Sequence, residues 1–559
     1  MKLIIFFLVN SVYAIYGHFI EGKFALRLYS DFSDDERVSP MKSSDFDKNV
    51  FVYKVLCVDL ELFDDNCKQN LQSLVEEKTW FDFPDIKQLT SFFYHSLLFS
   101  DIHSISYHTI KYTSPGYHTQ TEQHLSGILI LPKTENIKGV ILYYHSTLDS
   151  NSSSPSIKIP SQYTESENFN LIYTMFASNG YIVIIPDYIG FGTNSLVMHP
   201  YVFGARENAL SGIYMLQAVR QYLKDTLSID ISNQKLFISG YSEGAGYALK
   251  STELLDTEFA YILTDLHLTL QKTFAGNGIY SYEDTQNFMV ADIQIHQNED
   301  NLWHTVPLCI SEPHLCKNPK ESDGIGEAKS DLSFYRLYYS LYFFTSLASY
   351  HDQYNLKKLL KKDVYNLKNC LYIIGASVRA ESCKGHYLKI KNFDELIKTS
   401  LYPISTFIFL VRPVIRYTGY EYGHSRKFIE LQRELYSTPN TYTSILHFVN
   451  KNFLEDQEFI QYLKNEIDTF NLSIQTPVEI LYTQYDSQVP NVNSEHACSH
   501  YDGLPAHTKS PGLIKCLQLN NKKFWSSITR YNTTYLQHSD TEGIFAVHEI
   551  QTMNKITSK

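Results

Sequence analysis

The sequence predicts an α/β fold, with a mostly parallel β-sheet, helices on both of its faces and one large insertion. Between residues 139 and 255, short apolar runs typical of buried strands alternate with helical segments. The pentapeptide Gly240-Tyr241-Ser242-Glu243-Gly244 stands directly between such a strand and such a helix. The middle of the chain lacks the alternation, and a buried-strand pattern returns only at residue 478. These features predict a sheet core that a long insertion interrupts.

The predicted elements follow one another in a simple order. A polar turn separates two strand-like segments, residues 104–112 and 126–131, which predicts a hairpin. Continuous apolar runs predict four buried strands: residues 139–144, 181–186, 235–239 and 478–483. Helical patterns cover residues 170–178, 208–223, 245–254 and 543–552. Residues 528–531 are a last strand candidate.

Composition excludes several classes of protein. Hydrophobic residues make up 43% and charged residues 19%, which is unlike collagen-like, linker-like or generally disordered chains. The net charge of −12 argues against a nucleic-acid binder that depends on a basic face. The 43 tyrosines and 34 phenylalanines are an unusual excess. Such rings suit surfaces that meet apolar ligands, although they also suit ordinary packing.

The N-terminus predicts secretion. Lys2 precedes an apolar run over residues 3–9, and small residues follow at Ala14 and Gly17. This is the pattern of a signal peptide, with cleavage after Ala14 or Gly17. The apolar run is far below the roughly 20 residues that span a bilayer. We therefore expect an extracellular or periplasmic protein, according to the organism.

Eight cysteines agree with an oxidising compartment. They fall in near neighbours along the chain, and an even count in a secreted protein predicts disulfides. Eight cysteines allow 105 pairings, so the connectivity is not determined by the sequence. Nearest-neighbour pairing is the favoured hypothesis: Cys57 with Cys67, Cys309 with Cys316, Cys370 with Cys383, and Cys498 with Cys516.

Ser242 is the candidate nucleophile. It is the central residue of a Gly-x-Ser-x-Gly pattern, in which a strand turns sharply into a helix and holds the serine in a strained conformation. The flanking glycines remove side chains that would clash in the turn. The helix N-terminus beneath the serine favours developing negative charge. A bare pentapeptide is a weak signal, but the flanking strand and helix are the context that the pattern requires.

A serine nucleophile needs a base, and the base needs an orienting carboxylate. In folds built around this turn, the acid and then the histidine follow the serine along the chain. Asp486 comes just after the strand at 478–483 and is the candidate acid, with Glu495 as the fallback. His538 lies in a loop before the final predicted helix and is the candidate base.

Other histidines fit less well. His548 falls inside the final predicted helix, and His496 and His500 follow Asp486 too closely. The spacing of His496 and His500 resembles that of metal ligands, but the cysteine between them is better explained by a disulfide. We expect neither a metal nor a cofactor.

The oxyanion hole should combine two backbone N–H groups. One comes from Glu243, directly after the nucleophile, and the other from the loop after an earlier strand. The segment Ser146–Thr147 follows the strand at 139–144 and is the favoured second donor.

These residues together resemble the secreted lipase and esterase branch of the α/β-hydrolases, which includes fungal secretory lipases and related bacterial enzymes. Members show a Tyr-x-His-Gly-Thr loop, present here as Tyr143-Tyr144-His145-Ser146-Thr147 with serine in place of glycine. The Pro-Asp-Tyr-x-Gly-x-Gly pattern corresponds to residues 186–192, and His-Pro-Tyr to residues 199–201. Val489-Pro490 follows the acid loop as in the family. The resemblance covers residues 104–255 and 475–555 and implies that Asp187 is structural.

The resemblance implies an α/β-hydrolase with a cap over its active site. The expected parts are a signal peptide at 1–17, an N-terminal extension at 18–103, a first core part at 104–255, a cap at 256–470 and a second core part at 471–559. The cap contains the densest aromatic run, from which Tyr338, Tyr342 and Phe343 are candidate acyl-binding residues. The alternative is that these rings only pack the cap against itself.

The expected function is hydrolysis of a carboxylic ester through an acyl-enzyme, with a small-molecule or lipid ester as substrate and transient contact with a lipid interface. A secreted serine peptidase of the same fold is the main alternative, because the same triad cleaves amides. Acyl transfer to an alcohol and a non-catalytic binding role also remain open, because fold alone does not determine function. Neither the acyl chain length nor an oligomeric state is predicted.

Overall fold

A computed structural model describes the core of the chain and parts of the segment that interrupts it. The described residues are 103–117, 121–148, 151–157, 171–290, 294–297, 303–305, 339, 342–360, 362, 369–374, 377–382, 441–442, 450–483, 486, 489, 491–503, 514–519 and 538–558. The predicted signal peptide (1–17) and almost all of the predicted extension (18–103) lie outside them. The predicted strand at 528–531 also lies outside them.

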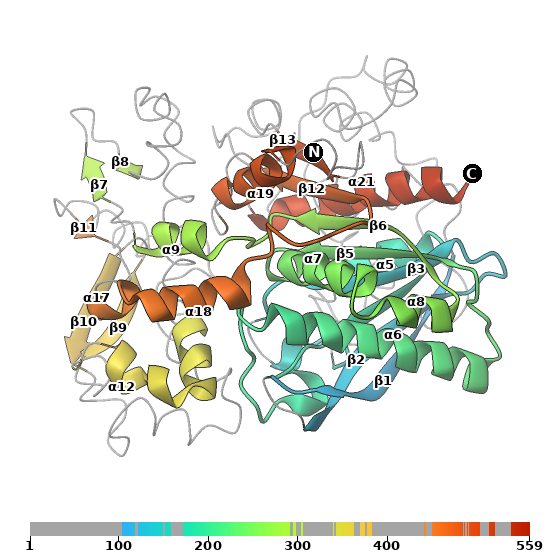
Figure 1. The fold of residues 1–559 in the computed structure, drawn as a ribbon, viewed down its shortest axis with the longest axis horizontal. Helices are drawn as coiled ribbons and strands as arrows, with labels where there is room; N and C mark the ends of the chain where they lie inside the picture. Colours follow the sequence, from blue (N-terminus) through green and yellow to red (C-terminus); the bar gives the residue numbers. More distant parts are fainter. Residues whose placement is uncertain are drawn as a thin grey trace, which may run out of the picture.

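An eight-stranded sheet forms the centre of the described molecule (Figure 1). Its strand order is β1-β2-β4-β3-β5-β6-β12-β13. The strands are β1 (Ile105–Pro115), β2 (Glu122–Pro132), β3 (Gly139–Tyr144), β4 (Tyr181–Pro186), β5 (Lys235–Tyr241), β6 (Thr269–Gly276), β12 (Val478–Thr483) and β13 (Ile514–Leu519). β2 runs antiparallel to both of its neighbours, whereas the pairs from β4 to β13 are parallel. The prediction of a mostly parallel sheet is confirmed.

The predicted strands are confirmed where the sequence carries uninterrupted apolar runs. Every residue of β3 and of β4 is buried, as expected for strands covered on both faces. The predicted hairpin is also present, with Ile110 opposite Gly127 in an antiparallel register. β5 extends two residues beyond the predicted strand and ends at Tyr241, immediately before Ser242.

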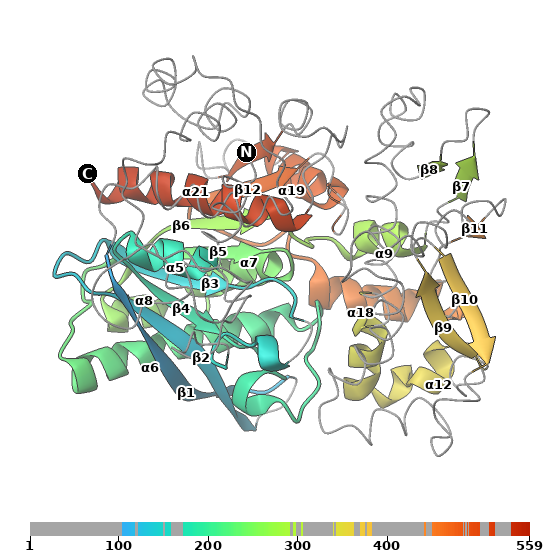
Figure 2. The same ribbon diagram turned by 180° about the vertical axis from the view of Figure 1, so that it is seen from behind.

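Helices cover both faces of the sheet. The face seen in Figure 1 carries α6 (Ala205–Leu227), α7 (Glu243–Asp256) and α8 (Ala260–Leu266). The opposite face, turned to the viewer in Figure 2, carries α5 (Leu171–Ser178) and α21 (His538–Thr557). The short helix α19 (Val492–Gly503) lies beside β12 and β13. This arrangement buries both faces of the strands that end near Ser242.

The central sheet contains two strands, β6 and β13, that the sequence pattern does not predict. β6 and the helix α8 lie inside residues 256–470, the predicted cap, yet β6 pairs with both β5 and β12. The segment between sheet strands therefore starts after Gly276, not at residue 256. The first half of β6 is polar and only partly buried, which hides its strand pattern. β13 pairs with β12 and was likewise missed.

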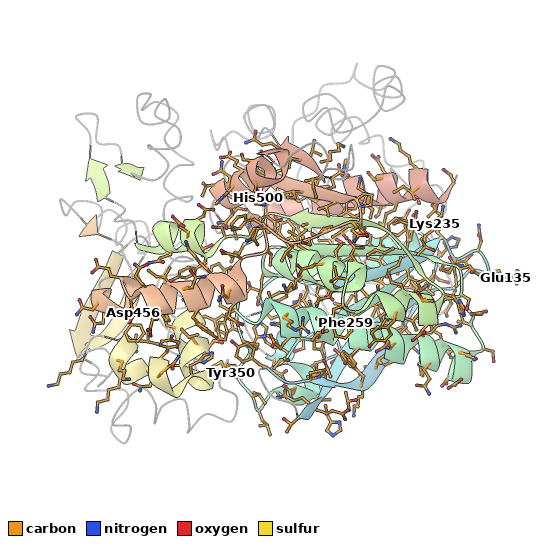
Figure 3. The ribbon with its side chains drawn as sticks, viewed as in Figure 1. Glu135, Lys235, Phe259, Tyr350, Asp456 and His500 are labelled. Carbon is orange, nitrogen blue, oxygen red and sulfur yellow. A yellow bond between two sulfur atoms is a disulfide. The ribbon has the colours of Figure 1, made fainter. Side chains whose placement is uncertain are left out.

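The described parts of the segment between β6 and β12 lie beyond one end of the sheet (Figures 1 and 2). The helical parts are α9 (Tyr282–Val290), a stretch at residues 342–350, α12 (Leu356–Leu359), α17 (Lys451–Leu454) and α18 (Gln457–Ile467). One small sheet contains β7 (Gln294–Gln297), β8 (Trp303–Thr305) and β11 (Thr441–Tyr442). The other contains β9 (Asn369–Ile374) and β10 (Ser377–Ser382). Asp456, labelled in Figure 3, caps α18 by accepting hydrogen bonds from Glu458 N and Phe459 N.

Polar contacts fasten this segment to the core. The Tyr117 hydroxyl, next to the tip of the β1–β2 hairpin, lies 2.6 Å from the Tyr462 hydroxyl of α18. The Tyr462 hydroxyl is also 2.6 Å from Nε2 of His351. Tyr350, labelled in Figure 3, donates a hydrogen bond to the carbonyl of Met198 in the core. The helical stretch 342–350 and α18 are thus both bonded to the core.

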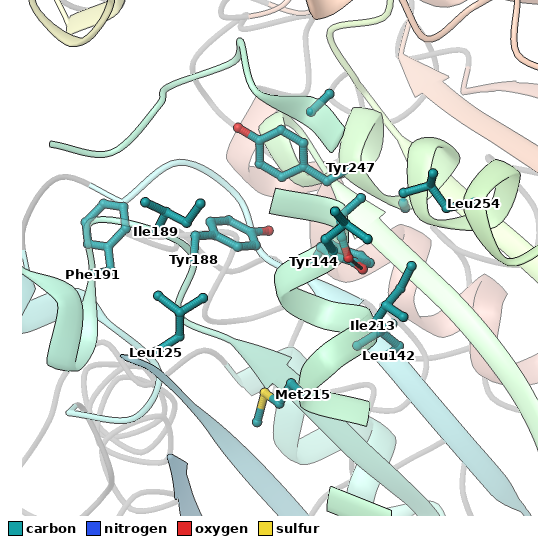
Figure 4. Packing of buried hydrophobic residues seen from close by; sticks show 14 of the residues in the cluster. Leu125, Leu142, Tyr144, Tyr188, Ile189, Phe191, Ile213, Met215, Tyr247 and Leu254 are labelled. Atoms are coloured by element: carbon teal, nitrogen blue, oxygen red, sulfur yellow. Dashed lines mark hydrogen bonds between the residues drawn. The ribbon is translucent and has the colours of Figure 1, made fainter. Parts of the chain in front are cut away.

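The hydrophobic core lies between the sheet and α6 and α7. Tyr144, Tyr188 and Tyr247 are fully or almost fully buried there among aliphatic side chains such as Leu142 and Ile213 (Figure 4). Part of the aromatic excess therefore stabilises the core itself. Among the described helices, none combines the length and the apolar character that a membrane-spanning helix needs.

Candidate active site

Ser242 occupies the turn between β5 and α7. Its φ of 56° and ψ of −121° lie outside the regions that side chains ordinarily adopt. Such strain is typical of a nucleophile held at a sharp strand-to-helix turn. Ser242 is 5% exposed, so the site is largely enclosed.

The two flanking glycines are required by close packing. A Cβ atom on Gly240 would lie 2.2 Å from the carbonyl oxygen of Gly244, and one on Gly244 would lie 2.1 Å from the carbonyl oxygen of Tyr144. No side chain fits at such distances. The close approach at Gly244 brings the end of β3, and the loop that follows it, against the N-terminus of α7.

His538 and Asp486 are brought together across the sheet edge. Asp486 follows β12, and His538 is the first residue of α21. Nδ1 of His538 donates to Oδ2 of Asp486 over 2.5 Å, and both side chains are buried. The other carboxylate oxygen accepts the backbone N–H of Val489 over 2.8 Å. This second bond fixes the carboxylate plane toward the imidazole.

The second ring nitrogen of His538, Nε2, is available to accept a proton. Nε2 of His538 is buried and has no hydrogen-bond partner among the described residues. The imidazole ring packs 5.1 Å from the ring of Tyr241, the residue before Ser242. A histidine held through Nδ1, with Nε2 unbonded beside a serine turn, is the arrangement of a general base.

A hydrogen-bond network centred on Asn277 links the three segments that carry these side chains. Its Nδ2 donates to the Tyr241 hydroxyl over 2.7 Å and to Thr541 Oγ1 over 2.8 Å. Its Oδ1 accepts the backbone N–H of Thr483, the last residue of β12. The Tyr241 hydroxyl in turn donates to the carbonyl of His538 over 2.5 Å. Sequence reasoning missed Asn277 because its partners lie far away along the chain.

The predicted oxyanion donors lie at the start of α7 and in the loop after β3. Glu243 begins α7, so its N–H belongs to the first turn and has no partner within the helix. Ser146 and Thr147 follow β3, whose Tyr144 is in register with Gly240 of β5. The carbonyl before Ser146 is fixed, because the Tyr188 hydroxyl donates to the carbonyl of His145 over 2.8 Å.

Serine at position 146 causes no backbone strain. Ser146 does not belong to the described non-glycine residues with positive φ. The glycine of the family pattern is therefore not needed here for its conformational freedom. The Ser146 carbonyl accepts a hydrogen bond from Nδ1 of His145 over 2.7 Å, which stiffens the loop further.

The alternative acid and bases have other partners. Glu495 lies on the exposed side of α19, where Asn491 donates to it. Nε2 of His548 lies 2.9 Å from Glu479, and Nδ1 of His496 lies 2.8 Å from Asp284. The ring of His500 packs against Phe470.

The disulfide between Cys498 and Cys516 is present and joins α19 to β13. This predicted pair is confirmed, and it accounts for the cysteine between His496 and His500. The side chains of the other six cysteines lie outside the described residues. Among the described side chains, no group of three or more potential ligands could hold a metal ion.

The candidate acyl-binding residues have packing partners. Tyr342 is fully buried and stacks on Tyr201, with ring centroids 4.2 Å apart and an interplanar angle of 7°. Phe343 is buried edge-on against Phe203 at 5.7 Å. Tyr338 lies outside the described residues. The two described rings thus pack against the core segment 198–203, not only against their own segment.

Comparison with known proteins bears on the fold. No protein-family model matches this chain, and no curated protein matches its sequence. A candidate hydrolase of Legionella pneumophila aligns over 81% of this chain and 89% of its own, with a TM-score of 0.50 and 19% identity. This likeness, together with the strand order and the turn at Ser242, establishes the α/β-hydrolase fold.

Two further solved structures align at lower scores. One is an esterase of Xanthomonas oryzae, LipA, described as degrading the rice cell wall, with a TM-score of 0.46, 16% identity and coverage of 81% of this chain and 91% of its own. The other is lipase A of Candida antarctica, with a TM-score of 0.40, 11% identity and coverage of 80% and 86%.

Proposed function

We propose that the chain is a secreted serine hydrolase of the lipase and esterase type, which cleaves carboxylic esters through an acyl-enzyme. The observation that carries the proposal is the buried hydrogen bond from His538 to Asp486 beside the strained turn of Ser242. A positioned base, an orienting carboxylate and a nucleophile held at a strained turn are the parts that acyl transfer needs. The fold shared with the candidate hydrolase of Legionella pneumophila is compatible with this reaction class.

In the proposed reaction, the Ser242 hydroxyl attacks the ester carbonyl while Nε2 of His538 takes its proton. Asp486 holds the imidazole tautomer and stabilises the imidazolium that forms. The N–H groups of Glu243 and of the Ser146–Thr147 segment receive the oxyanion. His538 then protonates the departing alcohol. A water molecule, activated by the same imidazole, releases the acid and restores the serine.

The decisive experiment compares Ser242→Ala with Ser251→Ala. Ser251 is a buried serine on the same helix, where it accepts a hydrogen bond from Tyr144. We expect Ser242→Ala to lose turnover of a p-nitrophenyl ester and labelling by a fluorophosphonate while its fold is unchanged. Ser251→Ala should keep both. Full activity or full labelling of Ser242→Ala would overturn the proposal.

Substrate profiling separates the ester reaction from the peptidase alternative. p-Nitrophenyl esters of graded acyl length, supplied below and above their solubility limits, report chain-length preference and activation at a lipid interface. Aminoacyl nitroanilides report amide cleavage. Faster turnover of the anilides than of all esters would favour the peptidase.

N-terminal sequencing of the protein from culture medium tests the predicted signal peptide. We expect a mature chain that starts after Ala14 or Gly17.

A further inference from the structure

A buried pair of His199 and Glu243 lies directly beneath the nucleophile turn. Nε2 of His199 is 2.7 Å from Oε1 of Glu243, and each side chain is 1% exposed. Glu243 is the residue after Ser242, and His199 belongs to the His-Pro-Tyr segment. Neither side chain has a part in the proposed reaction described above. Buried charged groups of this kind are costly unless they are paired.

The hydrogen bonds determine where the protons are. Nδ1 of His199 is 2.7 Å from the carbonyl oxygen of Ile189, which can only accept, so Nδ1 carries a proton. Oε1 of Glu243 accepts from the Tyr247 hydroxyl over 2.6 Å and from the backbone N–H of Val202 over 3.4 Å. Hydrogen-bond donors gathered around a carboxyl stabilise its ionised form, and an ionised carboxylate has no proton to give to Nε2. Nε2 of His199 therefore also carries a proton.

With both nitrogens protonated, His199 is an imidazolium that faces a carboxylate. Burial alone raises the pKa of Glu243, but the charge and hydrogen bond of His199 outweigh burial, so the pKa lies below its ordinary value. This direction agrees with the assignment that the hydrogen bonds require.

The charge of Glu243 matters because of its position in the chain. Its backbone N–H is the proposed oxyanion donor, so its carboxylate belongs to the same residue that must stabilise negative charge. An unpaired carboxylate at this place would oppose the oxyanion, and screening is weak in a buried site. A cation bonded to that carboxylate removes the opposition and anchors the side chain of the donor residue.

We infer that His199 is a positioning residue of the oxyanion hole, an imidazolium that neutralises Glu243 and fixes its peptide N–H toward the substrate. This inference rests on the proposed function. It assigns a role to the histidine of the His-Pro-Tyr segment and explains why an acidic residue is tolerated directly after the nucleophile.

Groups around the pair preserve this state. The ring of Tyr188 stacks between the two histidines, 5.8 Å from His199 and 3.9 Å from His145. Burial lowers the pKa of His145 to about 4, and the positive charge of His199 adds to the effect, so His145 stays neutral near pH 7. Tyr201 and Tyr342 complete the enclosure, each with its ring 6.4 Å from His199. His199 is therefore the one cation among the described groups that face this carboxylate.

The backbone of the segment is held as well. Ser346, from the helical stretch 342–350, donates to the carbonyl of His199 and accepts the N–H of Tyr201. The orientation of His199 thus depends on contacts with residues far away along the chain.

The first test reads the protonation state without any turnover. In the Ser242→Ala protein labelled with ¹⁵N-histidine, His199 should show two protonated ring nitrogens at pH 7, and its signals are assigned by their absence in a His199→Gln variant. In Glu243→Gln, a smaller fraction of His199 should carry two ring protons at this pH, because the carboxylate that pairs with the imidazole is gone. A neutral His199 at pH 7 in protein that retains Glu243 would overturn the inference, whatever the ester assays show.

The second test removes the charge of His199 and then that of Glu243, and measures kcat after each change. Losing one oxyanion donor typically costs about 10²–10³ in kcat, and we expect His199→Gln to lower kcat by about 100-fold with little change in KM. Adding Glu243→Gln to that variant removes the unpaired charge and should recover about tenfold or more. Tyr247→Phe removes a hydrogen bond from the same carboxylate but no charge, so its loss should be smaller.

The outcomes separate the two proposals. If His199→Gln fails to fold, the His199 signals are assigned by their contacts with the ring of Tyr188 instead, and the NMR measurement still decides the protonation state. No recovery in the double variant would contradict the electrostatic role of His199 and leave the ester hydrolase proposal standing. Retained turnover in Ser242→Ala would contradict the proposed function, whereas the imidazolium measurement would be unaffected.

Discussion

The side-chain amide of Asn277 donates a hydrogen bond to the hydroxyl of Tyr241 over 2.7 Å, directly behind the nucleophile turn. Asn277 ends the strand β6 region in a left-handed conformation, with φ at 42°, which asparagine tolerates better than most residues. Through Thr483 N and Thr541 Oγ1, the same amide reaches the strand before the acid and the helix that begins with the histidine. One side chain therefore sets the relative positions of the three segments that carry Ser242, Asp486 and His538.

Replacement of Asn277 should lower both stability and kcat. Asn277→Ala leaves buried partners unbonded, which costs about 1–3 kcal/mol of unfolding free energy. It also loosens the anchor of His538, so we expect kcat to fall about tenfold or more while KM changes little. Asn277→Gly relieves the backbone strain but lacks the amide, so it should regain part of the stability and none of the kcat.

A matched control is available in Asn493. This asparagine is equally buried, and its Oδ1 accepts the backbone N–H groups of Tyr280 and Ser281, away from the Tyr241 network. Asn493→Ala should lose stability but keep kcat in the protein that remains folded. Equal effects of the two variants on kcat, measured well below their melting temperatures, would refute the positioning role of Asn277.

Asp486→Asn should remove most of the catalytic rate. The amide cannot accept from both Nδ1 of His538 and the N–H of Val489 as the carboxylate does, so the imidazole loses its tautomer and its counter-charge. A comparable change in a serine protease costs about 10⁴-fold in kcat, and we expect a loss of about 10³–10⁴ here. Steady-state hydrolysis of a soluble ester measures it.

Asp187→Asn is the control for Asp486. Asp187 is also a buried carboxylate, but it accepts from the hydroxyl of Ser126 and the backbone N–H of Ser156, as a structural residue does. Its replacement should lower the melting temperature and keep the catalytic rate of the folded protein within about tenfold, because it removes one acceptor of a local network. Activity lost with Asp187→Asn and retained with Asp486→Asn would reverse the assignment.

The sheet strands were predictable where apolar runs are continuous, because burial on both faces demands such residues. The runs over β3, β4 and β12 match the structure at both ends. β6 was not predicted from the sequence, because Lys272 and its polar neighbours occupy its partly exposed half. Lys272 forms an ion pair with Glu479 there. A strand of this kind is recognised only once its partners are known.

The residues of the candidate site also fall into two groups, those that the sequence predicts and those that it does not. Ser242 was predictable because the glycines around it follow from steric exclusion within a few residues, which the distances at Gly244 bear out. Asp486 and His538 followed from their order after strands and before the last helix. The roles of Asn277 and His199 were not predictable, because they depend on contacts between residues that folding brings together from distant parts of the chain.

Glu549 should make stability depend on pH. This carboxyl on α21 is fully buried and accepts a hydrogen bond from Ser239, and burial raises its pKa to about 8. The charges of Glu479 and Glu542 contribute to this rise, and the hydrogen bond from Ser239 partly offsets it. Between pH of about 4.5 and about 8, the folded protein therefore keeps a proton that the unfolded chain has released. Because the folded state binds more protons, the free energy of unfolding falls as the pH rises through this window.

Thermal unfolding at intervals from pH 5 to pH 8 measures this slope. Glu549→Gln stays neutral in both states, so the slope should flatten. Glu258→Gln, which changes a carboxyl exposed to solvent and paired with Arg206, should leave the slope unchanged. A slope that is the same in the wild type and in Glu549→Gln would show that Glu549 is ionised in the folded protein.

The aromatic residues Tyr342 and Phe343 allow a test that separates packing from acyl binding. Their contacts with Tyr201 and Phe203 predict a packing role, so Tyr342→Ala and Phe343→Ala should each cost about 3–5 kcal/mol, as large-to-small changes in cores do. If packing is the whole role, the ranking of p-nitrophenyl esters by acyl length should be the same as in the wild type. Phe237→Ala is the control, because it removes a buried ring near the start of β5 that packs against Tyr181. It reports the effect of losing a buried ring on the acyl preference. A shift in acyl preference in Tyr342→Ala or Phe343→Ala, with none in Phe237→Ala, would instead show that these rings contact the acyl chain above Ser242.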